Sequence, residues 1–115
     1  MAVIVDIDDT LLRNGKEPIQ RVIDYVNALP DKIIIVTGRN KSERKETIAA
    51  LRAAGVRYSR LIMNPGTPRE TEKFKYETAV KLGSQVTLAI DNNATMRNAY
   101  RRAGLKTKDP ATLPD

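Results

Sequence analysis

The chain contains neither cysteine nor histidine. The side chains available for chemistry are therefore carboxylates, amides, hydroxyls, amines and guanidinium groups. This composition excludes disulfides, thiolate nucleophiles and the imidazole groups that most often act as general bases or zinc ligands. Acid–base chemistry must therefore fall to carboxylates, lysine or tyrosine. Any bound metal should be a hard cation held by oxygen atoms.

Acidic residues follow two apolar runs that are far apart in the chain. Asp6 and Asp8 follow the first run, and Asp91 follows the run at residues 86–90. If folding brings these carboxylates together, their repulsion raises their pKa values and destabilises the fold. A divalent cation would relieve that repulsion, and ligands made only of oxygen suit Mg²⁺.

Polar residues also follow other apolar segments. Thr37, Gly38 and Arg39 come directly after the run at residues 32–36, and Lys73 and Lys75 lie in the first turns of a predicted helix. Lysine near the start of a helix is mildly disfavoured by the helix dipole, and a bound anion would reverse that effect. A cation site and such lysines together indicate a phosphate-bearing ligand.

Short apolar runs alternate with helical patterns along the whole chain. An Asn40–Glu43 capping box predicts one helix start, and Pro18 suits the first turn of an earlier helix. We expect strands at residues 2–7, 32–36, 60–63, 86–90 and 105–107, with helices from Pro18 to about residue 29 and at about 40–54, 71–82 and 93–103.

Strand–helix alternation with strands that are apolar on both faces predicts a parallel sheet covered by helices. Ligands bind at the carboxyl ends of the strands in such sheets, where the polar residues above would meet. We expect one α/β domain over residues 1–115, a three-layer Rossmann-like fold of roughly five strands with helices on both faces. The short segment at residues 11–17 leaves room for a flap and not for a cap domain.

Four segments resemble the motifs of the haloacid dehalogenase (HAD) superfamily. Residues 3–11, VIVDIDDTL, resemble its first motif, and residues 34–39, IIVTGR, resemble its second. Lys75 resembles the third motif, and residues 89–92, AIDN, resemble the fourth. The match covers residues 2–107 in the order of the family. It implies a HAD-like fold and a Mg²⁺-dependent phosphatase.

The resemblance also assigns roles to residues. It implies that Asp6 attacks phosphorus to form an aspartyl-phosphate and that Asp8 acts as general acid and base. Thr37 would bind the phosphoryl oxygens, and Lys75 would neutralise charge, with Lys73 as the alternative. The Asp6 carboxylate, the Asp8 carbonyl and Asp91 would hold Mg²⁺, with Asn92 as a further ligand. Asp9 is expected to be structural, since many members have glycine there.

A closer resemblance is to the 3′-phosphatase half of bacteriophage-type polynucleotide kinases, based on residues 33–39, 58–63 and 96–105 together with Arg69 and Lys75 near Glu77. It implies that Gly38 and Arg39 bind substrate and that 3′ phosphates of nucleic acid are removed. The sequence departs from these families at Asn92, commonly acidic, and at Thr71, where the kinase-linked enzymes have aspartate. It also carries no kinase half.

Other functions stay open at this point. The net charge of +6 favours an anionic partner such as a nucleic-acid end, yet a small-molecule or nucleotide phosphatase of the same superfamily fits the same motifs. Asn92 would also fit a catalytically weak binding module. A receiver domain is disfavoured because Asn64 stands where its phosphorylated aspartate should be.

The last helix and the bulk properties bear on partners and location. Arg97, Arg101 and Arg102 form either a solvated face or a track for phosphates. No apolar run is long enough to span a bilayer, so we expect a cytoplasmic protein with no membrane partner. A phosphorylated substrate is the expected partner, and nothing in the sequence indicates an oligomer.

Overall fold

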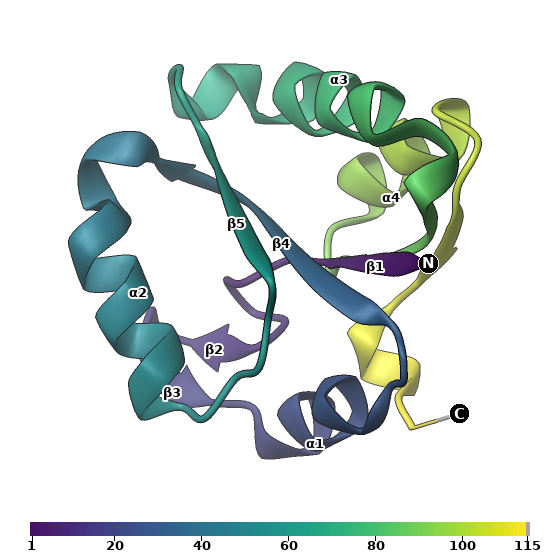
Figure 1. Ribbon diagram of the computed structural model, residues 1–115. Helices are drawn as coiled ribbons and strands as arrows, with labels where there is room; N and C mark the ends of the chain where they lie inside the picture. The colour runs from purple at the N-terminus through teal and green to yellow at the C-terminus, as the bar shows by residue number, and fades with distance from the viewer. Residues whose placement is uncertain (115) are drawn as a thin grey trace.

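The computed structural model describes residues 1–114, and its centre is a five-stranded parallel sheet with the strand order β5-β4-β1-β6-β7 (Figure 1). β1 lies at the middle of the sheet, so the segment that follows it enters the centre of the carboxyl edge. The strands are β1 (Ala2–Val5), β4 (Lys32–Asn40), β5 (Arg60–Asn64), β6 (Val86–Ile90) and β7 (Lys106–Lys108).

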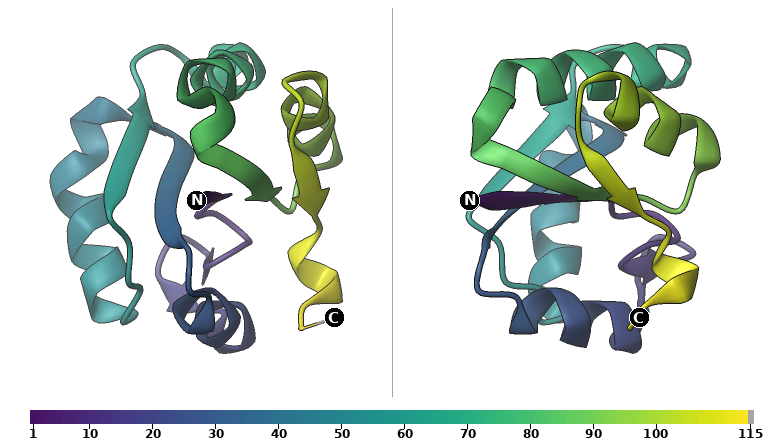
Figure 2. Two further views of the ribbon diagram at one scale, coloured as in Figure 1. Left: turned by 45° about the vertical axis from the view of Figure 1, so that its right-hand side comes forward. Right: turned by 90° about the vertical axis from the view of Figure 1, so that its right-hand side faces the viewer.

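Four helices cover the two faces of the sheet, which confirms the predicted three-layer α/β fold. Figures 1 and 2 show α1 (Gln20–Ala28) and α2 (Arg44–Ala53) on one side, with α3 (Thr71–Leu82) and α4 (Ala94–Arg102) on the other. Within residues 1–114, no helix combines the length and the apolar character needed to cross a bilayer.

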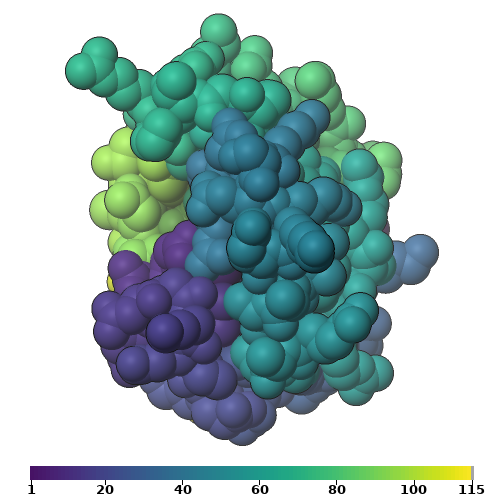
Figure 3. Space-filling view, turned by 90° about the vertical axis from the view of Figure 1, so that its left-hand side faces the viewer, coloured from purple at the N-terminus to yellow at the C-terminus, as the bar shows by residue number. Residues whose placement is uncertain are grey.

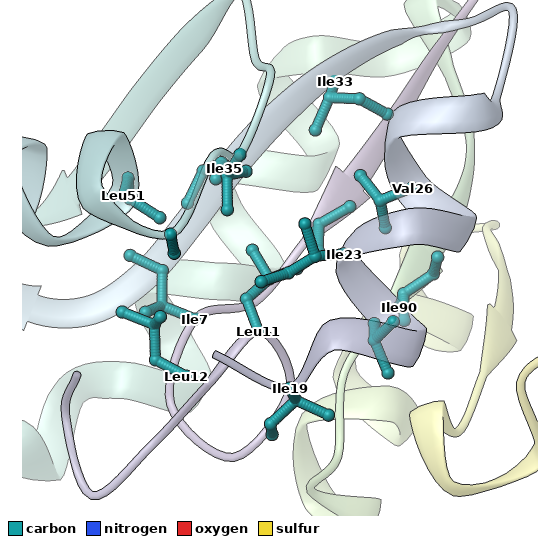
Figure 4. Close-up of a cluster of buried hydrophobic side chains, with 14 of the residues drawn as sticks. Ile7, Leu11, Leu12, Ile19, Ile23, Val26, Ile33, Ile35, Leu51 and Ile90 are labelled. Carbon is teal, nitrogen blue, oxygen red and sulfur yellow. The ribbon is translucent and has the colours of Figure 1, made fainter. Parts of the chain in front are cut away.

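Each face of the sheet has its own apolar core. Val3 and Val5 face the cluster under α1 and α2, whereas Ala2 and Ile4 face the cluster under α3 and α4. Because β1 is buried on both faces, its sequence is a continuous apolar run and does not alternate with polar residues. Figure 4 shows the first cluster, to which Ile23, Val26, Ile33, Ile35 and Leu51 contribute.

A small hairpin lies between β1 and α1. Its strands are β2 (Leu12–Arg13) and β3 (Glu17–Pro18), and Asn14 and Gly15 turn it with φ angles of 54° and 80°. Leu11 and Leu12 are fully buried in the first cluster, so they anchor the base of the hairpin to the core (Figure 4). The expectation for Pro18 was wrong: it pairs with Leu12 in β3, and the helix begins at Gln20.

The sheet differs from the prediction mainly at the end of β4. This strand continues to Asn40 and does not end at residue 36, and its register with β5 shifts between Thr37 and Asn40. The irregularity leaves Gly38 and Arg39 beyond the regular ladder. The predicted capping box at Asn40 and Glu43 is present, and a short 3₁₀ helix, η1 (Lys41–Glu43), precedes α2.

The remaining differences are shifts of element ends and short 3₁₀ turns. β1 ends at Val5, and β7 lies one residue later than predicted. The turns are η2 (Pro68–Glu70), η3 (Gly83–Gln85) and η4 (Pro110–Thr112).

Candidate active site

The polar segments meet at the carboxyl edge of the sheet, as the parallel topology requires. Figure 3 views this side of the molecule: the hairpin (purple), α2 (blue to teal), α3 (green) and the segment after β6 (yellow-green) surround the end of β1. The site residues therefore come from four separate parts of the chain.

A buried triad of Asp6, Lys75 and Asp91 forms the centre of the site. Lys75 Nζ donates to Asp6 Oδ1 at 2.9 Å and to Asp91 Oδ2 at 2.6 Å. The side chains of Lys75 and Asp91 are 3% and 1% exposed, so water screens these contacts very little. The two aspartates, 85 positions apart, thus lie on the same ammonium group.

The burial of this triad changes the protonation of its members. Burial raises the pKa of Asp6 from an ordinary value of 3.8 to about 6; Asp91 adds to the increase, whereas Lys75 and Thr10 oppose it. Burial alone would lower the pKa of Lys75, but the charges of Asp6 and Asp91 outweigh it and the pKa is raised. At neutral pH the triad therefore holds an ionised Asp6 beside a charged Lys75.

Thr10 is a site residue to which the sequence analysis gave no role. It is fully buried, its hydroxyl donates to Asp6 Oδ2 at 3.0 Å, and it accepts from the backbone N–H of Asn92 at 3.2 Å. Thr10 thus joins the segment after β1 to the segment after β6. The signal available in the sequence was that Thr10 belongs to the group of polar residues that follows the first apolar run, beside Asp8 and Asp9.

Asp8 lies in a different environment, at the exposed rim of the site. Arg39 binds its carboxylate with two hydrogen bonds, from Nε to Oδ2 at 3.0 Å and from Nη2 to Oδ1 at 2.8 Å. Arg39 Nη2 also donates to the carbonyl of Gly15 at 3.1 Å, and Nη1 to Thr47 Oγ1 at 3.3 Å. Arg39 therefore joins Asp8, the hairpin and α2.

Thr37 and Gly38 lie where β4 reaches the same edge. Thr37 is buried, and its Oγ1 accepts from the backbone N–H of Arg39 at 3.1 Å, so its hydroxyl proton is free to donate to a ligand. Gly38 passes close to the start of α3, since a Cβ atom there would lie 2.8 Å from Thr71 Cγ2. Close packing against Thr71 thus explains why glycine stands at position 38, in addition to its predicted binding role.

The loop that follows β1 explains two smaller sequence features. Asp9 has a φ angle of 61°, in the left-handed region that glycine adopts most easily. This conformation accounts for the expectation that Asp9 is structural. The Asp8 carboxylate, one residue earlier, binds Arg39, whereas Lys75 binds Asp6 and Asp91.

The predicted magnesium ligands include a backbone carbonyl and a carboxamide as well as carboxylates, and their oxygen atoms suit a hard cation. One terminal atom of the Asn92 carboxamide lies 3.0 Å from Asp6 Oδ2 and 3.0 Å from the carbonyl oxygen of Asp8, so these two oxygens converge on a single point. Oxygen groups that converge in this way suit Mg²⁺. Among residues 1–114, no three acidic side chains gather in one place, because the Asp8 carboxylate turns to Arg39 and position 92 is an amide.

The remaining candidates do not contact the side chains of the triad. Lys73 is exposed and lines a groove of about 670 Å³ between β5 and α3, whereas Lys75 points into the site. The arginines of α4 make contacts within the protein: Arg97 binds the carbonyl of Asp91, Arg101 binds Thr107, and Arg102 pairs with Glu72. Arg101 and Arg102 remain exposed at the surface while they make these contacts.

Tyr100 is a buried polar side chain close to the triad. Its hydroxyl is fully buried, and no described residue provides a hydrogen-bond partner. Burial raises its pKa well above the ordinary value, and the charges of Asp91 and Asp6 act in the same direction. Tyr100 therefore stays neutral and packs with Ala79 and Leu82 in the second core cluster.

The fold and the site define an α/β protein with a buried aspartate directly after its central strand. The family model of haloacid dehalogenase-like hydrolases matches residues 3–98, so the chain belongs to that family. This membership confirms the predicted family and agrees with the prediction that the chain is a phosphatase. No curated protein matches the sequence.

Two solved structures share the fold. A chain from the "Structure of the Pnkp1/Rnl/Hen1 RNA repair complex" matches 94% of this protein with a TM-score of 0.76 and 23% identity. A chain from the "Structure of Pnkp1/Rnl/Hen1 complex" matches 94% with a TM-score of 0.75 and 24% identity. This protein spans 41% and 45% of those chains. At this level of identity the likeness shows the fold alone.

Proposed function

We propose that this protein is a Mg²⁺-dependent phosphohydrolase that works through an aspartyl-phosphate on Asp6 and removes terminal 3′ phosphates from nucleic acid. The observation that carries the proposal is the position of Asp6: it directly follows the central strand, is buried, and shares Lys75 with Asp91. A carboxylate held in this way is a nucleophile with a fixed orientation.

The first chemical step uses residues with distinct tasks. Asp6 Oδ attacks phosphorus, the P–O bond to the leaving alcohol breaks, and the leaving oxygen takes a proton from Asp8. Lys75 and the Thr37 hydroxyl stabilise the negative charge on the transferring phosphoryl group. Bound Mg²⁺ would add charge stabilisation and alignment, held by Asp6, the Asp8 carbonyl, Asp91 and Asn92.

The second step releases phosphate. Asp8, now ionised, takes a proton from water, whose oxygen attacks phosphorus and displaces the Asp6 carboxylate. The half-exposed Asp8 side chain at the rim supports this role, because its carboxylate is within reach of water. To protonate the leaving oxygen in the first step, the carboxylate would turn from Arg39 toward the substrate. Arg39 holds Asp8 in place before substrate binds, and its remaining proposed role is to contact the substrate phosphate.

Four observations support nucleic acid as the substrate. The net charge is +6, the only insertion between β1 and α1 is a small hairpin, and the solved structures with this fold include chains from an RNA repair complex. The groove between β5 and α3 is lined by four basic residues, Lys41, Arg60, Lys73 and Lys81, and by two acidic ones, Glu70 and Glu77, so its net charge is positive. It reaches the carboxyl edge at Asn64 and Gly66. Such a basic groove would bind phosphates with little regard to sequence.

The deciding experiment is a phosphatase panel with and without Mg²⁺. Oligonucleotides with a 3′ or a 5′ phosphate, nucleoside monophosphates and a simple aryl phosphate should be compared with wild-type protein and Asp6→Asn. We expect Mg²⁺-dependent turnover, fastest on the 3′-phosphorylated oligonucleotide, that falls by on the order of 10³-fold or more in Asp6→Asn. Normal turnover by that variant, or full activity in EDTA, contradicts the proposal.

Two controls separate the parts of the proposal. Asp9→Asn changes the same kind of group in the same loop, and asparagine tolerates the φ angle of 61°, so its activity should stay near wild type. Lys73→Glu should slow the oligonucleotide and leave the aryl phosphate unchanged. Equal rates on all substrates would favour a small-molecule phosphatase, and no turnover of any substrate would favour a binding module.

A further inference from the structure

Asn92 follows β6, and its side chain occupies the point where two of the proposed cation ligands, Asp6 Oδ2 and the Asp8 carbonyl oxygen, converge. Its backbone N–H donates to Thr10 Oγ1 at 3.2 Å, which places the residue beside the segment after β1. From there the carboxamide reaches Asp6 Oδ2 and the Asp8 carbonyl, both 3.0 Å from one of its terminal atoms. A carboxamide has a donor and an acceptor of nearly the same size, so which atom lies at that point depends on the partners.

The two orientations of the carboxamide have opposite electrostatic consequences. With nitrogen at the point, Asn92 donates two hydrogen bonds, to Asp8 O and to Asp6 Oδ2, each 3.0 Å long. With oxygen there, three oxygen atoms face one another. The hydroxyl of Thr10 then offers a donor at 3.4 Å, but this hydroxyl already donates to Asp6 at 3.0 Å. A cation among the three oxygens would make the second orientation favourable.

We propose that the Asn92 side-chain amide is a built-in substitute for the divalent cation, and that it turns half a turn about its terminal torsion when the cation binds. This inference rests on the cation site of the proposed function and concerns how that site changes on binding. The nitrogen holds Asp6 and the Asp8 carbonyl in place without metal, and the oxygen becomes a ligand with metal.

A carboxylate at the same position would act differently. It would add a third negative charge beside Asp6 and Asp91, with Lys75 as the facing cation, and it has no N–H to donate. The protein without metal would then contain uncompensated repulsion, whereas the metal-bound protein would gain a stronger ligand. Compared with aspartate, Asn92 would therefore give a lower affinity for the metal but keep the site ordered at low metal concentration.

Asn92→Asp is the variant that tests this exchange, and Asn93→Asp is its matched control. Asn93 is the next residue; its side chain caps α4 by accepting from the Met96 N–H at 3.1 Å, a role that aspartate fills equally well. Both variants add one negative charge in the same loop. Only Asn92→Asp removes the amide from the convergence point.

The first measurements are titration calorimetry with Mg²⁺ and melting temperatures in EDTA and in Mg²⁺. For Asn92→Asp we expect the Mg²⁺ dissociation constant to fall about tenfold, because a charged ligand replaces a neutral one. We expect its melting temperature in EDTA to fall by about 4–8 °C and to recover in Mg²⁺. Asn93→Asp should bind Mg²⁺ within about twofold of wild type and keep its melting temperature, since the added charge lies outside the ligand set.

The turn of the amide can be observed directly in the wild-type protein. In ¹⁵N-correlated NMR spectra, the Asn92 NH₂ protons should exchange slowly in EDTA, and Mg²⁺ should shift them and increase their exchange. If Mg²⁺ binds but leaves this NH₂ group unchanged, or if Asn92→Asp and Asn93→Asp behave alike, the inference is wrong and the proposed function stands. If Mg²⁺ does not bind the wild-type protein at all, the cation site itself is wrong.

Discussion

Asp6 and Asp8 are two residues apart, yet they belong to two different regions of the site. The Asp6 side chain is 9% exposed and lies against Lys75 and Asp91, whereas the Asp8 side chain is 49% exposed and lies against Arg39 and the hairpin. Asp6 still follows the sheet, with its N–H donating to the Ile90 carbonyl at 3.0 Å. From Asp8 the chain leaves the sheet through the left-handed turn at Asp9.

The difference shows how one short motif provides two carboxylates with separate tasks. The buried region holds a charge in a fixed position and should be sensitive to any loss of a partner. The rim region is solvated, so its ion pair should contribute little to stability while it affects the orientation of Asp8. Variants that affect one region and not the other test this distinction.

The largest effect should come from Lys75→Met in the buried region. Removal of the ammonium leaves Asp6 and Asp91 facing each other without a countercharge, which should lower the free energy of unfolding by about 3–5 kcal/mol. Activity should fall by about 10²–10³-fold because the transferring phosphoryl group loses its cation. Lys73→Met, two residues away and exposed, should leave unfolding in urea and turnover of an aryl phosphate unchanged. Equal stability of the two variants would contradict the assignment of Lys75 to a buried triad.

Arg39→Lys tests the rim region, because it changes the ion pair with Asp8 and leaves the buried triad intact. Lysine keeps the charge but cannot form the paired hydrogen bonds to both oxygens of Asp8. We expect the free energy of unfolding to change by about 1 kcal/mol or less. We expect kcat/KM to fall by about 10²-fold as Asp8 loses its orientation. Arg44→Lys is the control, because Arg44 binds the carbonyl of Leu61 outside the site. A loss of stability as large as that of Lys75→Met would remove the distinction between the regions.

The pH dependence of activity should reflect the buried region. Because the pKa of Asp6 is raised to about 6, kcat/KM at low Mg²⁺ should fall about tenfold per pH unit below pH 6, where Asp6 is protonated and cannot attack. Higher Mg²⁺ favours the ionised form and should move this limb to lower pH. A rate that stays constant from pH 7 to pH 4 at low Mg²⁺ would argue against Asp6 as nucleophile.

The raised pKa of Asp6 affects stability in the opposite direction: low pH lowers activity but favours the folded state. The pKa of Asp6 in the folded protein lies above its value of 3.8 in the unfolded chain. Its contribution to folding is therefore fully present below about pH 4 and is lost as pH rises through about 6. Urea unfolding of wild type and Asp6→Asn between pH 4 and pH 7 should show that the variant lacks this dependence.

The smallest effect should come from Tyr100→Phe. Its hydroxyl is buried with no partner among the described residues, so removing it should leave stability unchanged or raise it by up to about 1 kcal/mol. Tyr25→Phe is a useful contrast, because the Tyr25 hydroxyl accepts from Lys108 Nζ at 3.2 Å and its loss should be slightly destabilising. A large loss of activity in Tyr100→Phe would show that this hydroxyl belongs to the site.

Much of the fold could be predicted because it depends on local patterns. The helix at Thr71–Leu82 and the strand at Val86–Ile90 lie where their periodicity and flanking glycines placed them, and the Asn40–Glu43 capping box formed as expected. Predictions of element ends were less accurate. Pro18 suits both a helix start and an edge strand, and its pairing with Leu12 decided between them.

The site was predicted as a group of residues and not as an arrangement. The topology of a parallel sheet implies that Asp6, Thr37 and Asp91 meet at one edge, and the structure brings their segments together. The roles of these residues stay predictions until the variants are measured. That Arg39 binds Asp8, and that Thr10 joins Asp6 to Asn92, could not be seen in the sequence, because these contacts span 31 and 82 positions.

By itself, the sequence determined the family, the parallel three-layer fold and the edge at which chemistry would occur, since hydrophobic periodicity and motif order are properties of short segments. The tertiary structure alone decided which lysine enters the site, why Gly38 has no room for a side chain, and how the Asn92 amide meets Asp6 and Asp8. The physical reason is that burial and hydrogen-bond partners arise from distant segments packed together, and these set the charge state of each group.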